Sequence, residues 1–272
     1  MKKPTKYFAQ RIVIATITVA LFVAQSILGD FPVWLFAAPL NLLVGILWVA
    51  AIWECYRRRT ASVTIEYLLS AEATYIALAV AAIRAVILGL ESTPSTTSWP
   101  VVGGALFVLT VLTLVILRGW RNSQGIRWRF LITHCGLWIA LISMFLGAPD
   151  KQILRVQVGD TPTREAINSK GEKCFLDYEL HLEDFEMEQS EDGTPKLFRA
   201  TIAVDGEIVN IEVNSPYSQH YGEDIYLVSY TPEECVLQIV REPWRMVSAI
   251  GIVMLLLGAF MLFMQGFQNR KR

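Results

Sequence analysis

Six long apolar runs divide this chain, and the last two of them enclose a polar stretch at residues 150–243. A helix needs about 20 apolar residues to cross roughly 30 Å of hydrocarbon, and each run is long enough. The predicted spans are Arg11–Gly29, Pro32–Trp53, Tyr67–Leu90, Pro100–Leu117, Phe130–Pro149 and Trp244–Met264. With 53% hydrophobic residues and a mean hydropathy of +0.41, the chain has the composition of an integral membrane protein.

Charge is distributed unevenly along the chain. Residues 150–243 hold 20 of the 25 acidic residues and only 8 of the 24 basic ones, which gives this stretch a net charge of −12. Basic residues gather at alternate span ends, at Lys2–Arg11, Arg57–Arg59, Arg118–Arg129 and Arg270–Arg272. The positive-inside rule therefore predicts that both termini are cytoplasmic and that residues 150–243 are extracytoplasmic.

The acidic stretch has the two-residue period of half-buried strands. Alternating apolar residues occupy Leu176–Leu182, Phe198–Val204 and Val209–Val213, and two more apolar strands follow at Ile225–Tyr230 and Val236–Val240. Asp192-Gly193 and Asp205-Gly206 are predicted hairpin turns, because glycine accepts positive φ. We therefore predict five or six antiparallel strands in an all-β domain inserted before the last helix.

The predicted organisation is a membrane region at 1–149, an extracytoplasmic β domain at 150–243, and a final span with a basic tail at 244–272. The first span has an alternative interpretation as a cleaved signal peptide, which leaves the other orientations unchanged. Cys174 and Cys235 both fall in the outer domain, where one disulfide and two separate buried thiols are equally open alternatives.

A series of short motifs in the second half of the chain resembles the ResB (CcsB) family of cytochrome c biogenesis proteins. The motifs are Tyr178–Glu188 with its L-x-D-F strand, Asp192–Lys196 (D-G-x-P-K), Val213–Pro216 (V-N-x-P), Gly222–Tyr230 (I-Y-x-x-S-Y) and Arg241–Trp244 (R-[DE]-P-W). Each motif is short, but all five occur in the family's order and end at a membrane helix. The best match runs from Phe130 to the end, and the third and fourth spans resemble an added pair.

The resemblance implies a subunit of the machinery that moves haem across the membrane and attaches it to apocytochromes c. It implies a CcsA-type membrane partner, because the tryptophan-rich haem loop of that partner is missing here. Such a subunit acts in the lipid membrane that bounds a bacterial cytoplasm, binds no nucleic acid and does not complete catalysis by its own residues. The alternative function is a membrane scaffold or sensor whose β domain binds an envelope protein or peptide. The acidic surface either attracts a basic apocytochrome segment or keeps the domain soluble.

Four residues of the fifth span and the loop before it are candidate cofactor contacts. The resemblance assigns haem handling to His134, and neutral imidazole is a good axial ligand for haem iron; the alternative role is an interhelical hydrogen bond. Arg127 and Arg129 are candidates to pair with haem propionates, with topology anchoring as their alternative role. Trp138 lies one turn after His134, where its ring either contacts the haem or packs against a neighbouring helix. No second histidine occurs in a span, so the second axial ligand is expected from the partner.

Overall fold

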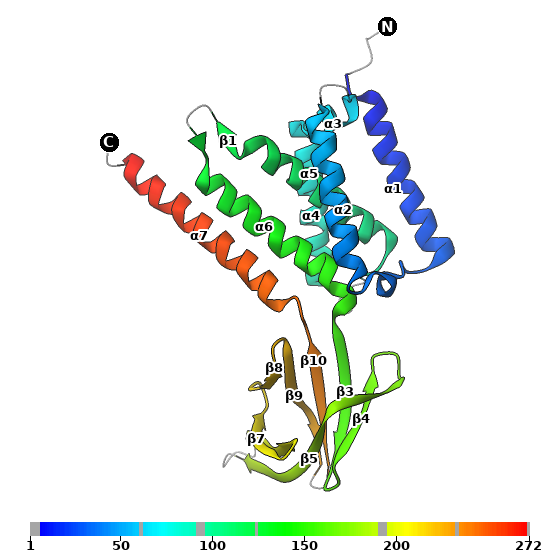
Figure 1. Cartoon of the computed structure of the whole chain (residues 1–272), viewed down its shortest axis with the longest axis vertical. Helices are drawn as coiled ribbons and strands as arrows, with labels where there is room; N and C mark the ends of the chain where they lie inside the picture. The colour runs from blue at the N-terminus through cyan, green and yellow to red at the C-terminus, as the bar shows by residue number, and fades with distance from the viewer. Residues whose placement is uncertain are drawn as a thin grey trace. The chain divides into compact units, whose positions relative to one another are not determined.

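The computed structural model describes residues 6–59, 62–90, 96–122, 125–189, 195–231 and 234–270. It divides into two compact units (Figure 1). The membrane unit comprises Met1–Pro149 and Val247–Arg272, and the β unit comprises Asp150–Met246.

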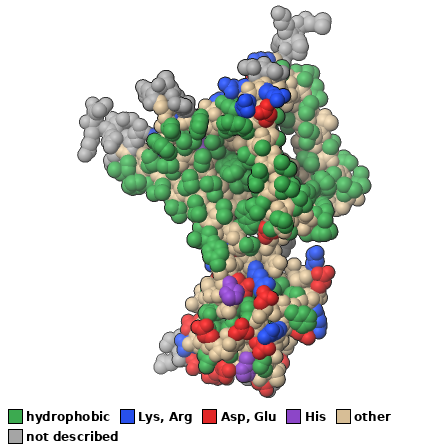
Figure 2. Space-filling model, viewed as in Figure 1, with side chains coloured by type: hydrophobic (Ala, Val, Ile, Leu, Met, Phe, Trp, Pro, Cys, Tyr) green, Lys and Arg blue, Asp and Glu red, His purple; other side chains and the backbone are tan. Residues whose placement is uncertain are grey.

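Six helices among the described residues are long and apolar enough to cross a membrane, which confirms the six predicted spans. They are α1 (Phe8–Leu28), α2 (Leu40–Arg57), α4 (Ala71–Leu90), α5 (Trp99–Gly119), α6 (Trp128–Gly147) and α7 (Arg245–Arg270). Apolar side chains cover the visible face of these helices in Figure 2. Apolar side chains are suited to face lipid tails, because the tails neither donate nor accept hydrogen bonds.

Two predicted spans begin later than the hydropathy pattern indicated. Pro32 and Pro39 lack backbone N–H groups, and the chain between them forms only a short 3₁₀ turn, η1 (Val33–Phe36), before α2 starts at Leu40. The third predicted span is divided into a short helix, α3 (Val63–Leu68), and α4. Ser70 separates the two, because its Oγ accepts a hydrogen bond from the backbone N–H of Ala73 at 3.3 Å.

The last two long helices pack through glycine. An added Cβ at Gly136 of α6 would lie 2.8 Å from the backbone nitrogen of Leu255 and 2.9 Å from the carbonyl oxygen of Gly251 on α7. Further along the same contact, the hydroxyls of Ser143 and Ser248 are hydrogen-bonded at 2.8 Å. Small residues allow membrane helices to approach this closely, so the α6–α7 pair is held by backbone proximity and one polar contact.

The β unit is one antiparallel sheet of eight described strands in the order β7-β6-β5-β4-β3-β10-β9-β8. The strands are β3 (Gln152–Val158), β4 (Thr163–Asn168), β5 (Lys173–Gln189), β6 (Pro195–Val204), β7 (Glu207–Glu212), β8 (Tyr217–His220), β9 (Glu223–Tyr230) and β10 (Cys235–Arg241). Strand β7 also contacts β8 and β9, so the sheet curls until its two edge strands approach each other. A two-stranded hairpin, β1 (Arg121–Asn122) and β2 (Gly125–Ile126), lies outside this sheet, between α5 and α6.

The interior of the curled sheet is the hydrophobic core of the β unit. Leu180, Ile202, Ile211, Ile225 and Ile239 are completely buried there, and they occupy the inward positions of the strand alternation. The predicted antiparallel domain is confirmed, but its strand number was too low. Strands β3, β4 and β8 were not predicted. Of these, β4 and β8 are short and lack a run of apolar residues.

One of the two predicted hairpin turns can be checked. Asp205 and Gly206 both have positive φ, at 47° and 84°, and they join β6 to β7. The other, Asp192-Gly193, lies outside the described residues.

Candidate functional site

His134 lies in the second turn of α6, and its side chain is only partly buried. Its Nδ1 is 2.9 Å from the carbonyl oxygen of Phe130, one turn earlier. Because a carbonyl oxygen accepts and cannot donate, Nδ1 is the donor in this contact and carries a proton. In a neutral imidazole this arrangement leaves the lone pair on Nε2, and Nε2 has no hydrogen-bond partner among the residues that the structure describes. The nitrogen that such a ring could offer to a ligand is therefore Nε2.

Phe130 also contacts His134 through its ring. The two rings are stacked, with centroids 4.0 Å apart and an interplanar angle of 26°. The guanidinium of Arg127 lies over the Phe130 ring, 4.9 Å from its centroid. Arg127, Phe130 and His134 are thus in contact one after the other, from the guanidinium to the imidazole.

An open groove of about 540 Å³ lies between the first turn of α6 and the last described side chains of α7. Arg127, Trp128, Arg129 and Phe130 line one side, and Phe260, Met261 and Met264 line the other. Its volume is within the roughly 300–1,000 Å³ of ligand sites in proteins. Within the described part of the chain, neither arginine forms an ion pair with a carboxylate. The groove therefore combines two uncompensated cations with an apolar wall.

Trp138 points to a different neighbour. Its indole N–H donates to the hydroxyl of Thr113 on α5 at 2.8 Å, and that hydroxyl donates to the carbonyl of Leu109 at 2.7 Å. Trp138 does not line the groove. Of the four predicted contacts, the structure brings Arg127 and Arg129 together at the groove, links His134 to it through Phe130, and places Trp138 against α5.

The contribution of α7 to the groove was missed by sequence reasoning. Phe260, Met261 and Met264 are apolar residues in an apolar span, and no sequence signal separates them from lipid-facing neighbours. Phe130 carried a weak signal, since a residue four positions before a histidine shares its helix face.

A second group of polar residues lies at the end of the β unit where the chain continues into α7. Glu223 is buried, with 5% of its surface exposed, and it accepts hydrogen bonds from the Tyr178 hydroxyl and from Arg241. Burial and the neighbouring Glu223 carboxylate raise the pKa of Tyr178 well above its usual range. Tyr178 therefore remains a protonated donor to Glu223.

The next residue along β9 has its own set of partners. Asp224 accepts a hydrogen bond from Ser218 at 2.6 Å and an ion-paired hydrogen bond from Arg245 in the first turn of α7. Burial opposes ionisation of this carboxyl, but the contacts with Ser218 and Arg245 outweigh it and lower the pKa of Asp224. Nearby, the indole N–H of Trp244 donates to Asp150 at 2.6 Å. These contacts hold together the ends of the β unit at which the chain enters and leaves it.

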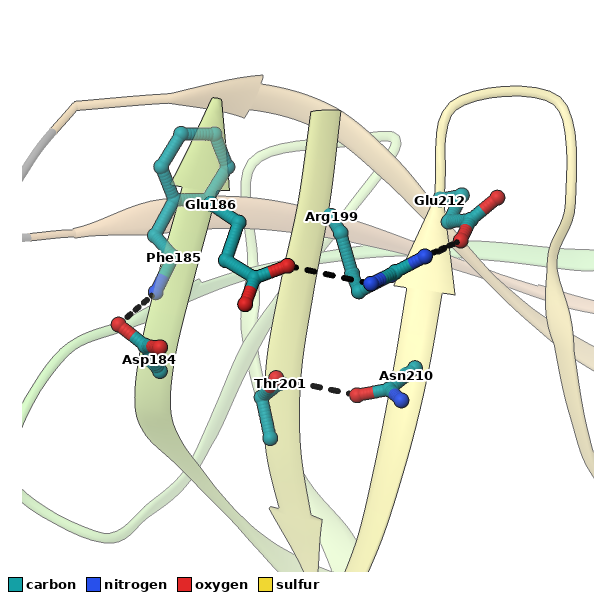
Figure 3. A network of polar contacts seen from close by, with 7 residues as sticks. All are labelled: Asp184, Phe185, Glu186, Arg199, Thr201, Asn210 and Glu212. Carbon is teal, nitrogen blue, oxygen red and sulfur yellow. Dashed lines mark hydrogen bonds and ion pairs between the residues drawn. The ribbon is translucent and has the colours of Figure 1, made fainter. Parts of the chain in front are cut away.

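The outer face of β5, β6 and β7 is acidic but partly neutralised (Figure 3). Arg199 donates to Glu186 at 3.1 Å and to Glu212 at 2.7 and 2.9 Å. The hydrogen bonds that Arg199 donates to the Glu212 carboxylate are the main reason that the pKa of Arg199 is raised. Figure 3 also shows Thr201 of β6 bonded to Asn210 of β7 at 3.0 Å. The described polar side chains of this face thus form cross-strand pairs.

The cysteines and the remaining histidines form no metal centre within the described residues, where no group of three metal-binding side chains occurs. Cys174 and Cys235 are free thiols, which favours the second of the two alternatives for this pair. His181 lies beside Glu183 at 3.1 Å, and exposed His220 meets the Tyr178 ring edge-on at 6.2 Å.

Residues 125–236 match the ResB-like family, so the chain carries a ResB-like domain that begins just before α6 and ends in β10. Comparison with curated protein sequences gives no match. Three chains of solved structure match, and one of them is a cytochrome c heme lyase, CcmF. That similarity has a TM-score of 0.41 at 9% sequence identity, and it covers 95% of this chain and 46% of the lyase chain. This chain thus spans about half the length of that structure.

Proposed function

We propose that this chain, through its ResB-like domain, is a subunit of the cytochrome c maturation machinery. In this role it handles haem with a CcsA-type membrane partner and delivers it to apocytochromes c. The observation that carries the proposal is the His134 imidazole, whose Nε2 lone pair is kept free within the segment that matches the family. The subunit acts as a haem-handling and chaperoning component, and attachment is completed with the partner.

The residues at the site fit haem as a cargo molecule. Haem brings an iron that takes axial nitrogen ligands and two propionate carboxylates on an apolar ring system. The His134 imidazole offers the nitrogen, and Arg127 and Arg129 offer two cations that lack a carboxylate among the described residues. Arginine suits carboxylates because its planar guanidinium donates two parallel hydrogen bonds. Trp138 supports this face of α6 through its bond to Thr113 rather than through the groove.

The second axial ligand belongs to the partner in this proposal. The chain has three histidines, and two of them, His181 and His220, are in the β unit. His134 is therefore the one histidine of the membrane unit. A single ligand per subunit gives a shared site, which suits a cargo that must be received and released.

The proposed orientation places both chain termini in the cytoplasm of a bacterium and the β unit outside, where apocytochrome c is met. The support is the distribution of Lys and Arg over the loops, with the short segments around Asp30 and at 91–99 free of both. In this orientation Arg127 and Arg129 lie at the cytoplasmic end of α6, at headgroup depth, so the groove faces the side on which haem is made available.

The test is complementation of a strain that lacks this gene, with c-type cytochromes measured by their covalently bound haem after denaturing electrophoresis. The native chain is expected to restore them and His134→Ala to reduce them at least tenfold at equal chain abundance. His181→Ala is the matched control, because it removes an imidazole from the β unit, and it is expected to behave as native. Normal cytochromes in the deletion strain itself would contradict the proposal and favour the scaffold or sensor function.

A further inference from the structure

Phe130 contacts His134 twice, once through its backbone and once through its ring. No other described residue is placed to fix both the proton position and the plane of this imidazole. We propose that Phe130 is a positioning residue for His134, and that Gly119 of α5 makes the position of the Phe130 ring possible. This inference rests on the proposed function, because it takes His134 as the haem ligand.

The backbone contact sets which nitrogen carries the proton. In an α-helix the carbonyl of residue 130 already accepts the N–H of residue 134. A carbonyl oxygen has a second lone pair, and here that lone pair accepts the Nδ1 proton at 2.9 Å. The contact costs the helix nothing, since the first hydrogen bond is retained. The acceptor is a backbone atom and is present whatever side chain occupies position 130, but it binds the Nδ1 proton only while the imidazole is turned toward it.

The ring contact sets the plane of the imidazole. The torsion that turns a histidine ring is broad and roughly two-fold, so one hydrogen bond alone leaves the ring free to swing. Stacking at 4.0 Å and 26° covers one face of the imidazole and restricts this swing. The Nε2 lone pair then points in one direction. A side chain without an aromatic face at position 130 removes this restriction and keeps the backbone acceptor.

Gly119 leaves the space that the Phe130 ring occupies. It ends α5, and an added Cβ there would lie 2.7 Å from Cε1 and 3.0 Å from Cε2 of Phe130, which is closer than carbon atoms pack. Any side chain at position 119 must therefore displace the ring. A substitution at Gly119 of α5 therefore disturbs the stacking of Phe130 on His134 without any change in the sequence of α6.

The other contacts of Phe130 agree with a fixed ring. The Arg127 guanidinium lies 4.9 Å from its centroid, and the ring forms part of the groove wall. Freeing one side chain that must be ordered on binding weakens affinity by roughly 2- to 10-fold. The expected effect of losing the stack is of this size, well below the effect of losing the ligand itself.

The experiment compares four variants in the full chain purified with its membrane partner: Phe130→Leu, Phe130→Tyr, Gly119→Ala and His134→Ala. Haem affinity is measured by absorbance titration. A haem-free readout is the ¹⁵N spectrum of histidine-labelled protein, in which His134→Ala identifies the His134 signals among those of three histidines. This spectrum reports the proton position directly.

Phe130→Leu and Gly119→Ala are expected to weaken haem binding roughly 2- to 10-fold and to mix the two imidazole tautomers. Phe130→Tyr, which keeps the aromatic face, is expected to retain native affinity and a single Nδ1–H tautomer. If His134→Ala abolishes binding while Phe130→Leu and Gly119→Ala match the native protein in both readouts, the positioning role is wrong and the proposed function stands. If His134→Ala binds haem as the native chain does, the ligand assignment is wrong and the inference falls with it.

Discussion

Arg241 of β10 lies directly across the antiparallel pair from Glu223 of β9, and the two side chains form an ion pair at the end of the sheet that continues into α7. Only 7% of the Glu223 side chain and 26% of the Arg241 side chain are exposed. The pair joins the two last strands of the β unit where the chain leaves it. Tyr178 from β5 completes the contact from across the core.

Removing one partner of this pair is expected to destabilise the β unit. Arg241→Met leaves a buried carboxylate with Tyr178 alone, and the free energy of unfolding should fall by about 3 kcal/mol. The double variant Arg241→Met/Glu223→Gln should recover most of this loss, since no buried charge remains. Hydrogen exchange of the β9 and β10 amides measures the free energy of unfolding of the single and the double variant. Arg164→Met is the control, because its pair with Glu179 is half-exposed at 51% on each side and should change stability by less than about 1 kcal/mol. Equal losses at Arg164 and Arg241 would contradict this account.

Asp224 predicts a pH dependence of stability. Its folded pKa lies below the ordinary value of 3.8, so the unfolded chain takes up the proton first as pH falls. The stabilisation from the Ser218 and Arg245 contacts is thus complete above about pH 3.8 and is lost as pH falls through the lower folded value. The stability gap between the native chain and Asp224→Asn, measured by acid unfolding, should narrow below pH 3.8. A gap that stays constant down to the acid limit would refute the assignment.

The glycine contact between α6 and α7 should not accept a side chain. At Gly251 an added Cβ would lie 2.9 Å from the carbonyl oxygen of Gly136, so Gly251→Leu must separate the helices. Cysteines at positions 143 and 248, where the native serine hydroxyls are 2.8 Å apart, should form a disulfide on oxidation. Adding Gly251→Leu should reduce its yield several-fold. Gly89→Leu, with no described atom within 4 Å of an added Cβ, should leave the yield unchanged. Unaltered cross-linking in Gly251→Leu would show that the helices are not held this way.

The four cysteines should differ in reactivity. Cys55 is exposed, whereas Cys235 is buried and burial raises the pKa of its thiol to about 11. At pH 8 maleimide should modify Cys235 at least about 100-fold more slowly than Cys55, because the thiolate is the reactive form. Mass spectrometry of the labelled chain measures both rates. If Cys174 and Cys235 resist labelling after denaturation and react only after reduction, the pair is a disulfide.

Hydropathy was sufficient to find the membrane helices but not where they start. A window average treats the residues around Pro32 and Pro39 as part of one apolar run, whereas the missing N–H groups restrict the helix to Leu40 onward. In the β unit, the alternation of Leu154, Val156 and Val158 in β3 is as regular as in the predicted strands, so β3 was within reach of the sequence although it was not predicted. Short β4 and β8 depend on their neighbours, since they bring few apolar residues of their own.

At the site, residue type and position along α6 identified His134, Arg127 and Arg129, but not what surrounds them. The tautomer of His134 depends on a side-chain torsion, and the direction of Trp138 depends on how α6 is rotated against α5. The groove wall from Phe260 and Met264 depends on the crossing of α6 and α7. These are tertiary relationships, and one sequence contains no pattern from which to derive them. Likewise the motif residues Glu223 and Arg241 were recognised, but their ion pair was not.

The central claim is that Nε2 of His134 binds haem iron. The most direct measurement is the absorbance spectrum of the full chain purified with the proposed CcsA-type partner, for the native chain, His134→Gly, and His134→Gly supplied with imidazole. The account predicts a haem Soret band in the native complex, its loss or a marked shift in His134→Gly, and its return when imidazole fills the space of the missing side chain. The same band in His134→Gly without imidazole would contradict it.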